Sequence, residues 1–184
     1  MGSATSEPRL SDIAKHLILP EGITSTGWPR VRDRCKLFSL GFDRWQDGLG
    51  RGILAKRDSG LYAAGIDGVQ VSMPRQVGKT YTFGAIIFAL CTLQENLFVL
   101  WTAHRTRTAD EPFAAMQALA LKPEIAPYID GRPRQANGQQ QIKFTNGSRI
   151  LFGARDGGFG RGFAGVDIIV FDEAQILGQR ALDD

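Results

Sequence analysis

The sequence has no apolar run long enough to cross a membrane, because polar residues interrupt its longest hydrophobic stretches. Its amino terminus lacks the basic segment and apolar core of a signal peptide. It contains only two cysteines, Cys35 and Cys91, too few for a disulfide framework. We therefore expect a cytoplasmic protein without a membrane partner, in which Cys91 is a buried, reduced thiol.

Histidine is also scarce, since His16 and His104 are the only two in the chain. With so few histidines and with cysteines far apart in sequence, no zinc-ligand spacing is present. We expect His104 to be a hydrogen-bonded structural residue. The 184 residues are 43% hydrophobic and 22% charged, which is typical of a globular protein with its own core. The net charge of +3 is compatible with a polyanionic partner without establishing one.

The principal motif lacks one of its usual glycines. An apolar segment at residues 69–73 precedes a loop that ends in Gly78-Lys79-Thr80 and opens an apolar helix. The phosphate-binding pattern G-x-x-x-x-G-K-[ST] starts with glycine, where this chain has Met73. In such a loop the backbone N–H groups bind phosphate, the lysine contacts the β- and γ-phosphates, and the threonine binds Mg²⁺. An ordinary strand–turn–helix with a surface lysine is the alternative at this point.

A second apolar segment, at residues 166–171, ends in Asp172-Glu173. In a phosphate-transfer site Asp172 would hold the metal, directly or through water, and Glu173 would polarise the attacking water. Two such motifs in one chain are rarely coincidental. Together they predict a site that binds ATP and Mg²⁺ and hydrolyses ATP.

The remaining pattern alternates strands and helices, so we predict an α/β fold with a mainly parallel central sheet covered on both faces. Asp67-Gly68 and Asn146-Gly147 each indicate a β-hairpin. Helices are predicted within residues 13–19 (capped by Ser11), 43–55 and 80–93, and a further helix after a cap at Thr108 or Asp110. Strands are predicted at 61–66, 69–73, 97–102, 141–145, 148–152 and 166–171. Residues 122–140 are predicted to be loop.

The chain resembles the ATPase domain of the large terminase subunit of tailed bacteriophages, over roughly residues 40–180. The loop that lacks its first glycine but contains Arg75-Gln76 is characteristic of that family. Trp45-Gln46 is similar to its adenine-reading glutamine motif. The segments 102–105 and 146–174 complete the resemblance, the latter with a hairpin, a glycine-rich stretch and the acidic strand in order.

The resemblance implies a P-loop NTPase of the ASCE type, a three-layer sandwich, with residues 1–40 as an amino-terminal extension and residues 41–184 as a partial ATPase domain. It implies a motor that powers packaging of double-stranded DNA into a procapsid in the host bacterial cytoplasm. The implied partners are DNA, the phage portal and the small terminase subunit, and the full-length protein would form a homo-oligomeric ring. The implied nucleotide-binding residues are Gln46, Pro74, Arg75, Gln76, Val77, Gly78, Lys79 and Thr80.

The implied catalytic residues are Glu173, Arg75, Lys79 and Arg161, and the implied metal ligands are Thr80 and Asp172. Arg75 would stabilise the γ-phosphate, with a solvated loop arginine as the alternative. Gln46 would bind the adenine edge, with a surface glutamine as the alternative. Arg161 would reach the ATP of a neighbouring subunit, and Arg155 is the competing candidate for that role. The alternative role for such an arginine is a contact to a DNA phosphate.

The family's coupling segment, further strands and nuclease domain are expected after the acidic strand, so we expect an incomplete ATPase domain without nuclease activity. Whether this chain turns over ATP is left open. Two other interpretations remain. One is a helicase-type P-loop ATPase, because residues 172–175 read Asp-Glu-Ala-Gln, similar to a helicase acidic box. The other is a nucleotide-binding remnant that does not hydrolyse ATP.

Overall fold

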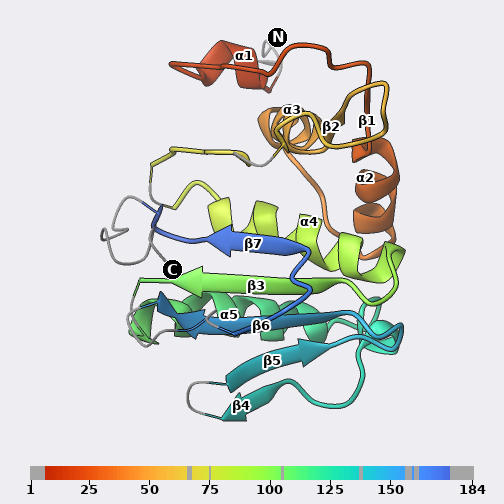
Figure 1. Ribbon diagram of the computed structural model, residues 1–184, viewed down its shortest axis with the longest axis vertical. Helices are drawn as coiled ribbons and strands as arrows, with labels where there is room; N and C mark the ends of the chain where they lie inside the picture. Colours follow the sequence, from red (N-terminus) through yellow and green to blue (C-terminus); the bar gives the residue numbers. More distant parts are fainter. Residues whose placement is uncertain are drawn as a thin grey trace, which may run out of the picture. The chain divides into compact units, whose positions relative to one another are not determined.

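The computed structural model describes residues 7–65, 68–74, 76–104, 106–136, 139–155, 159 and 162–174. The chain divides into two compact units, unit 1 (Met1–Ala89) and unit 2 (Leu90–Asp184), and the division falls within helix α4 (Lys79–Leu93). Helices and strands are both present, so the α/β class is confirmed (Figure 1). Within the described ranges, no helix combines the length and apolar character needed to cross a membrane. The domain boundary predicted after residue 40 stays a prediction.

Unit 1 is mainly helical. It contains α1 (Leu10–Ile13), α2 (Trp28–Leu37), α3 (Arg44–Ile53) and most of α4, and β1 (Ser25–Thr26) pairs antiparallel with β2 (Ala55–Lys56). The predicted helices at 43–55 and 80–93 are confirmed as α3 and α4. The helix predicted within residues 13–19 is wrong, because α1 ends at Ile13 and the next residue, Ala14, has an extended backbone with φ of −72° and ψ of 121°.

Helices α2 and α3 approach closely at Trp28 and Gly50. Trp28 is fully buried, and its indole Nε1 donates to Asp47 Oδ1 over 2.7 Å. A Cβ on Gly50 would lie 2.4 Å from the Trp28 ring, so only glycine fits there. Glycine lowers helix propensity, but here the close packing that it permits compensates for that cost.

The hairpin predicted around Asp67-Gly68 is wrong for the described residues. Residues 68–74 belong to no strand, and Tyr62 forms only an isolated bridge with Lys56. Turns take the place of the hairpin: the N–H of Gly65 donates to Tyr62, and the N–H of Gly68 donates to Gly65. Both glycines have positive φ, which favours tight turns over extended pairing. Val69 is 46% exposed, so the apolar residues of this segment do not define a buried strand.

Unit 2 contains a five-stranded sheet in the order β4-β5-β6-β3-β7, and α5 (Thr106–Ala120) contacts β3, β5 and β6. The strands are β3 (Phe98–Ala103), β4 (Arg134–Ala136), β5 (Gln139–Lys143), β6 (Arg149–Ala154) and β7 (Ile168–Phe171). β3 pairs parallel with β6 and β7, whereas β5 pairs antiparallel with β4 and β6. The sheet is therefore mixed, which corrects the prediction of a mainly parallel sheet.

The hairpin at Asn146-Gly147 is confirmed. Gly147 has φ of +84°, and the Asn146 side chain donates to the carbonyls of Cys91 and Gln94, which ties the turn to the end of α4. The apolar strands predicted at 97–102 and 166–171 are confirmed as β3 and β7. The loop predicted for residues 122–140 is wrong in part, because it contains the 3₁₀ helix η2 (Ala126–Tyr128) and β4. Helix α5 begins at Thr106, before either predicted cap.

Candidate functional site

The candidate phosphate loop leads directly into α4. Lys79 is the first residue of α4, and the carbonyl of Gly78 accepts the N–H of Thr82, so Gly78 stands at the helix N-terminus. Gln76 and Gly78 both have left-handed backbones, with φ of +63° and +83°. Glycine adopts this conformation without strain, whereas it is uncommon for a glutamine. N–H groups at a helix N-terminus lack acceptors within the helix and suit an anion.

The side chains of the loop differ in exposure. Pro74, Gln76 and Val77 are exposed, whereas Lys79 and Thr80 are half-buried. Arg75 lies outside the described residues, so its predicted γ-phosphate contact stays a prediction. A lysine and a hydroxyl at the first two positions of the helix are placed next to the loop, as a phosphate site requires.

Gln46 lies against this loop in unit 1. It is 5% exposed; its Oε1 accepts the N–H of Asp43 over 2.8 Å, and its Nε2 donates to Thr82 Oγ1 over 2.7 Å. The Thr82 hydroxyl in turn donates to the Gly78 carbonyl over 2.9 Å. A Cβ built on Gly78 would lie 3.4 Å from Gln46 Nε2. The glutamine amide is therefore bonded within the chain and supports the loop; an adenine contact, through its remaining hydrogen-bonding capacity, stays a prediction.

The acidic pair lies in unit 2, immediately after β7. The N–H of Asp172 donates to the Thr102 carbonyl over 2.8 Å, which continues the pairing of β7 with β3. Asp172 Oδ1 accepts the N–H of Glu173 over 3.0 Å, and Glu173 has φ of +54°. A non-glycine residue in this conformation is uncommon and often stands at functional sites. Both carboxylates are half-buried at the carboxyl end of the strand.

Arg155 connects the carboxyl ends of three strands. It follows β6 directly, and its Nη1 donates to the carbonyl and hydroxyl of Thr102, near the end of β3, over 2.9 and 3.0 Å. Its Nη2 donates to the carbonyls of Asp172 and Glu173, after β7, over 3.0 and 3.5 Å. The guanidinium also lies 5.8 Å from the centroid of the Phe171 ring. As it stands, Arg155 supports the acidic turn of its own chain.

Arg161, predicted to act on a neighbouring subunit, lies outside the described residues, as Arg75 does. Sequence reasoning also missed two contributors, Thr82 and the intrachain role of Arg155. A hydroxyl four residues after Gly78, on the helix that the loop opens, was the available signal for Thr82. Nothing in the local sequence indicates that Arg155, and not Arg161, supports the acidic residues of its own chain.

Thr80 in unit 1 and Asp172 in unit 2 each carry an oxygen ligand of the kind that Mg²⁺ prefers. Mg²⁺ prefers oxygen ligands and usually takes one or two from protein, with the rest from water and phosphate. Thr80 supplies a hydroxyl and Asp172 a carboxylate. In the described part of the chain, no three His, Cys, Asp or Glu residues gather in a group that holds a metal ion.

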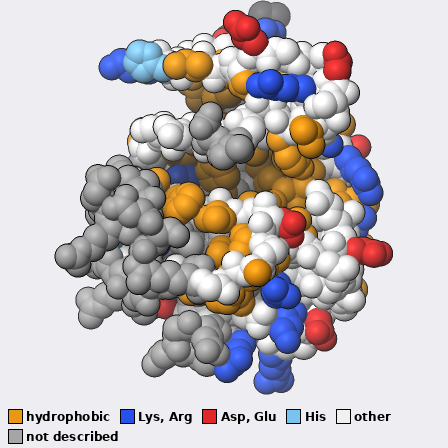
Figure 2. All heavy atoms as spheres, in the orientation of Figure 1, with side chains coloured by type: hydrophobic (Ala, Val, Ile, Leu, Met, Phe, Trp, Pro, Cys, Tyr) orange, Lys and Arg blue, Asp and Glu red, His pale blue; other side chains and the backbone are white. Residues whose placement is uncertain are grey.

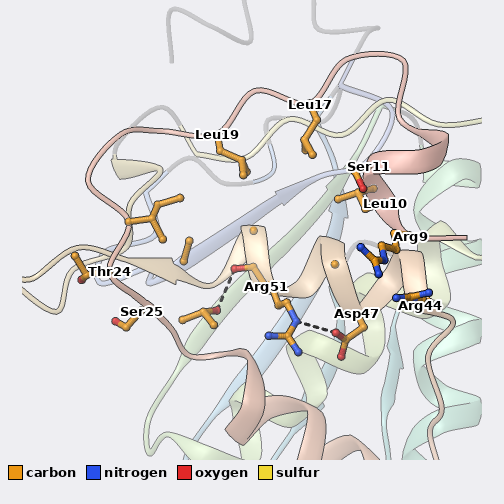
Figure 3. A pocket seen from close by; sticks show the side chains of 15 residues that line it. Arg9, Leu10, Ser11, Leu17, Leu19, Thr24, Ser25, Arg44, Asp47 and Arg51 are labelled. Atoms are coloured by element: carbon orange, nitrogen blue, oxygen red, sulfur yellow. Dashed lines mark hydrogen bonds and ion pairs between the residues drawn. The ribbon is translucent and has the colours of Figure 1, made fainter.

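A separate cavity of about 610 Å³ lies in unit 1, and none of residues 74–80 lines it. In Figure 3, Leu17 and Leu19 point toward α3 from the segment between α1 and β1, and Arg51 pairs with Asp47 in its wall. Burial alone would raise the pKa of Asp47, but hydrogen bonds from Trp28, Arg51 and Arg32 outweigh that effect and lower it. The contacts of Asp47 thus stabilise the helix pair.

A comparison with protein-family models finds no match, and a comparison with curated proteins finds none either.

Proposed function

We propose that the chain is the ATP-binding and ATP-hydrolysing motor domain of a phage terminase large subunit, which powers the packaging of double-stranded DNA into a procapsid. The observation that carries the proposal is the placement of Gly78-Lys79-Thr80, with a left-handed Gly78 at the start of a 15-residue helix. That placement matches what a phosphate loop needs for backbone N–H groups, a cation and a metal-binding hydroxyl to act on one anion.

In this proposal, residues 74–80 bind the phosphates of ATP. Lys79 and Arg75 offset the negative charge that develops on the transferred phosphoryl group. Thr80 and Asp172 hold Mg²⁺, which when bound neutralises part of the phosphate charge. Gln46 lies under the loop and, through Thr82, orients the Gly78 peptide.

Glu173 orients the water that attacks the γ-phosphate. Its backbone has φ of +54° and is held on both sides, by Asp172 Oδ1 at its N–H and by Arg155 at its carbonyl. A restrained backbone limits the directions that the carboxylate can take, which favours a positioning role. This arrangement supports the assignment of Glu173 over a solvated strand-end residue.

The assembly-level parts of the proposal follow from the resemblance alone. Arg161 would act on the ATP of a neighbouring subunit within a homo-oligomeric ring, and the ring would engage DNA, the portal and the small terminase subunit. Arg155 is the weaker candidate for that role, because its guanidinium already bonds to Thr102, Asp172 and Glu173.

A nucleotide-binding role without turnover is the second candidate. It is favoured by residues 68–74, which enter the phosphate loop without belonging to a strand. A phosphate loop anchored by a strand is held more rigidly, and rigid positioning contributes strongly to phosphoryl transfer. A helicase-type ATPase rests on its acidic box alone, and no contact of the described residues favours it.

Phosphate release with ATP and Mg²⁺ tests the proposal, measured together with nucleotide binding for the wild type, Glu173→Gln and the exposed control Glu95→Gln. We expect the wild type and the control to bind and hydrolyse ATP, and Glu173→Gln to bind without turnover. Binding without turnover in all three proteins would favour the second candidate. If folded wild type does not bind ATP, both candidates are wrong.

A further inference from the structure

Basic side chains gather on one face of the ladder formed by β4, β5 and β6. Arg134 pairs with Gln141, and Lys143 pairs with Arg149. Cross-strand partners point to the same side of a sheet, and so do residues two apart in one strand. Arg134, Lys143 and Arg149 therefore share one face, with Gln141 between them, and all three basic side chains are exposed.

The other face of this ladder is apolar. Ile142 and Ile150 are fully buried, Phe152 is 1% exposed, and the Phe152 ring lies 5.3 Å from that of Phe113 on α5. Helix α5 thus accounts for one side of the ladder. The basic residues lie on the opposite side, where Arg149 stacks on the Phe98 ring and the side chains of Arg134 and Lys143 are exposed.

The basic face is hollowed at one end. A cavity of about 230 Å³ is lined by Arg132, Arg134 and Lys143, together with Asp130, Gly131 and Gln141. Among the described residues, no carboxylate forms an ion pair with Arg132, Arg134, Lys143 or Arg149. Figure 2 shows Lys and Arg side chains gathered at the end of unit 2 that carries β4 and β5.

We propose that this basic face, made of Arg132, Arg134, Lys143 and Arg149, binds the phosphate backbone of duplex DNA. Three of these cations, Arg132, Arg134 and Lys143, line a hollow whose described lining contains one carboxylate, that of Asp130, and this balance suits a polyanion. The neighbouring glutamine supplies a neutral amide, which contacts phosphate or sugar without adding charge.

The chemistry favours a duplex over a single strand. Single strands bind to exposed aromatic rings on which their bases stack. Phe98 lies beneath Arg149 and is 3% exposed, and the Arg149 guanidinium lies 3.9 Å from its ring centroid, so this ring is not open to a base. Phe163, whose ring lies 5.8 Å from that of Phe98, is 42% exposed. One exposed ring gives a single base a stacking partner, whereas the four cations give contacts to a phosphate backbone.

Protection of an edge strand does not account for the pattern. Charged residues on an edge strand prevent pairing with other chains, and β4 is such an edge. Lys143 and Arg149, however, stand on β5 and β6, which are paired on both sides. Half of the cations are thus placed where edge protection gives no benefit.

Fluorescence anisotropy with a labelled short duplex of mixed sequence, without nucleotide, tests this binding. At physiological salt we expect non-specific affinity with a dissociation constant of about 10⁻⁶ to 10⁻⁴ M, and tighter binding at low salt. Four phosphate contacts predict a loss of about a hundredfold in affinity between about 50 and 200 mM salt. Arg134→Gln and Lys143→Gln should each reduce the salt slope by about 1. The control Arg30→Gln removes an exposed arginine of unit 1 and should leave the slope unchanged.

Three results would overturn the proposal: no binding by the wild type that circular dichroism shows to be folded, equal weakening by Arg30→Gln, or tighter binding of a single strand of the same length. Circular dichroism of the two variants, compared with the wild type, shows whether lost binding reflects lost structure. Because the assay contains no ATP, its outcome is independent of the proposed hydrolysis. A chain that fails to bind ATP can still bind DNA through this face, and the reverse also holds.

Discussion

Gln46 Nε2 donates a hydrogen bond to Thr82 Oγ1 over 2.7 Å, and both side chains are buried. The bond joins α3 to α4 beside Gly78, whose carbonyl accepts the Thr82 hydroxyl. Gln46 thus supports the candidate phosphate loop in this structure, and its predicted adenine contact stays a prediction. The two roles differ in what they predict for a variant, because a support affects folding as well as nucleotide binding.

We predict that Gln46→Ala lowers the free energy of unfolding by about 1 to 3 kcal/mol, because it leaves the Asp43 N–H without its acceptor and Thr82 without its donor. Thr82→Val removes the same bond from the other side. In a double-mutant cycle by urea denaturation, the two substitutions should be non-additive by about 0.5 kcal/mol or more. Full additivity would mean that the bond contributes nothing to folding.

Replacement of Gly78 by alanine should abolish nucleotide binding at a modest cost in stability. The left-handed backbone costs an L-residue about 1 to 2 kcal/mol, and the new Cβ would lie 3.4 Å from Gln46 Nε2. Gly60→Ala is the matched control, because Gly60 has φ of +78° and a Cβ added there would have no neighbour within 4 Å. Fluorescent-nucleotide titration and urea denaturation of both variants separate strain from site loss. Equal nucleotide affinity in the two variants would contradict the prediction.

Arg155→Ala should slow ATP turnover more than it weakens ATP binding. The substitution removes donors to Thr102, Asp172 and Glu173, so the acidic turn loses its restraint, while the phosphate loop keeps its own contacts. We expect kcat to fall by at least about tenfold with KM nearly unchanged, as for a lost positioning contact. Arg155→Lys retains a charge without the planar fork and should rescue little. A change confined to KM would contradict the positioning role.

The thiols should be unreactive in the folded protein. Burial raises the pKa of Cys35 from 9.0 to about 12 and also raises that of Cys91. Because the pKa of Cys35 is higher in the folded than in the unfolded state, its contribution to stability is complete below about 9.0 and is lost as the pH rises toward 12. Titration with a thiol reagent near neutral pH should detect no thiol until urea is added, and then both cysteines. Cys35→Ala should weaken the alkaline loss of stability; an unchanged profile would exclude this group as its cause.

Several elements followed from local sequence. Gly78-Lys79-Thr80 marks the start of α4, Asn146-Gly147 forms the predicted hairpin turn, and the apolar runs before Ala103 and Asp172 are strands. Each of these features depends on residues close together in the chain, where turn chemistry and hydrophobic pattern act directly. The mixed character of the sheet did not follow, because β4 arises in a segment whose Pro, Gly and Gln content favours loop.

The sequence by itself predicted which residues would bind phosphate and metal, and it located the helix and the strand on which they stand. Only the tertiary structure decided that Gln46 supports the loop through Thr82, that Arg155 binds the acidic turn, and that residues 68–74 stay outside the sheet. These outcomes depend on partners far away in the chain. Hydrogen bonds and strand pairs of that kind form only when folding brings the partners together, so composition and spacing do not encode them locally.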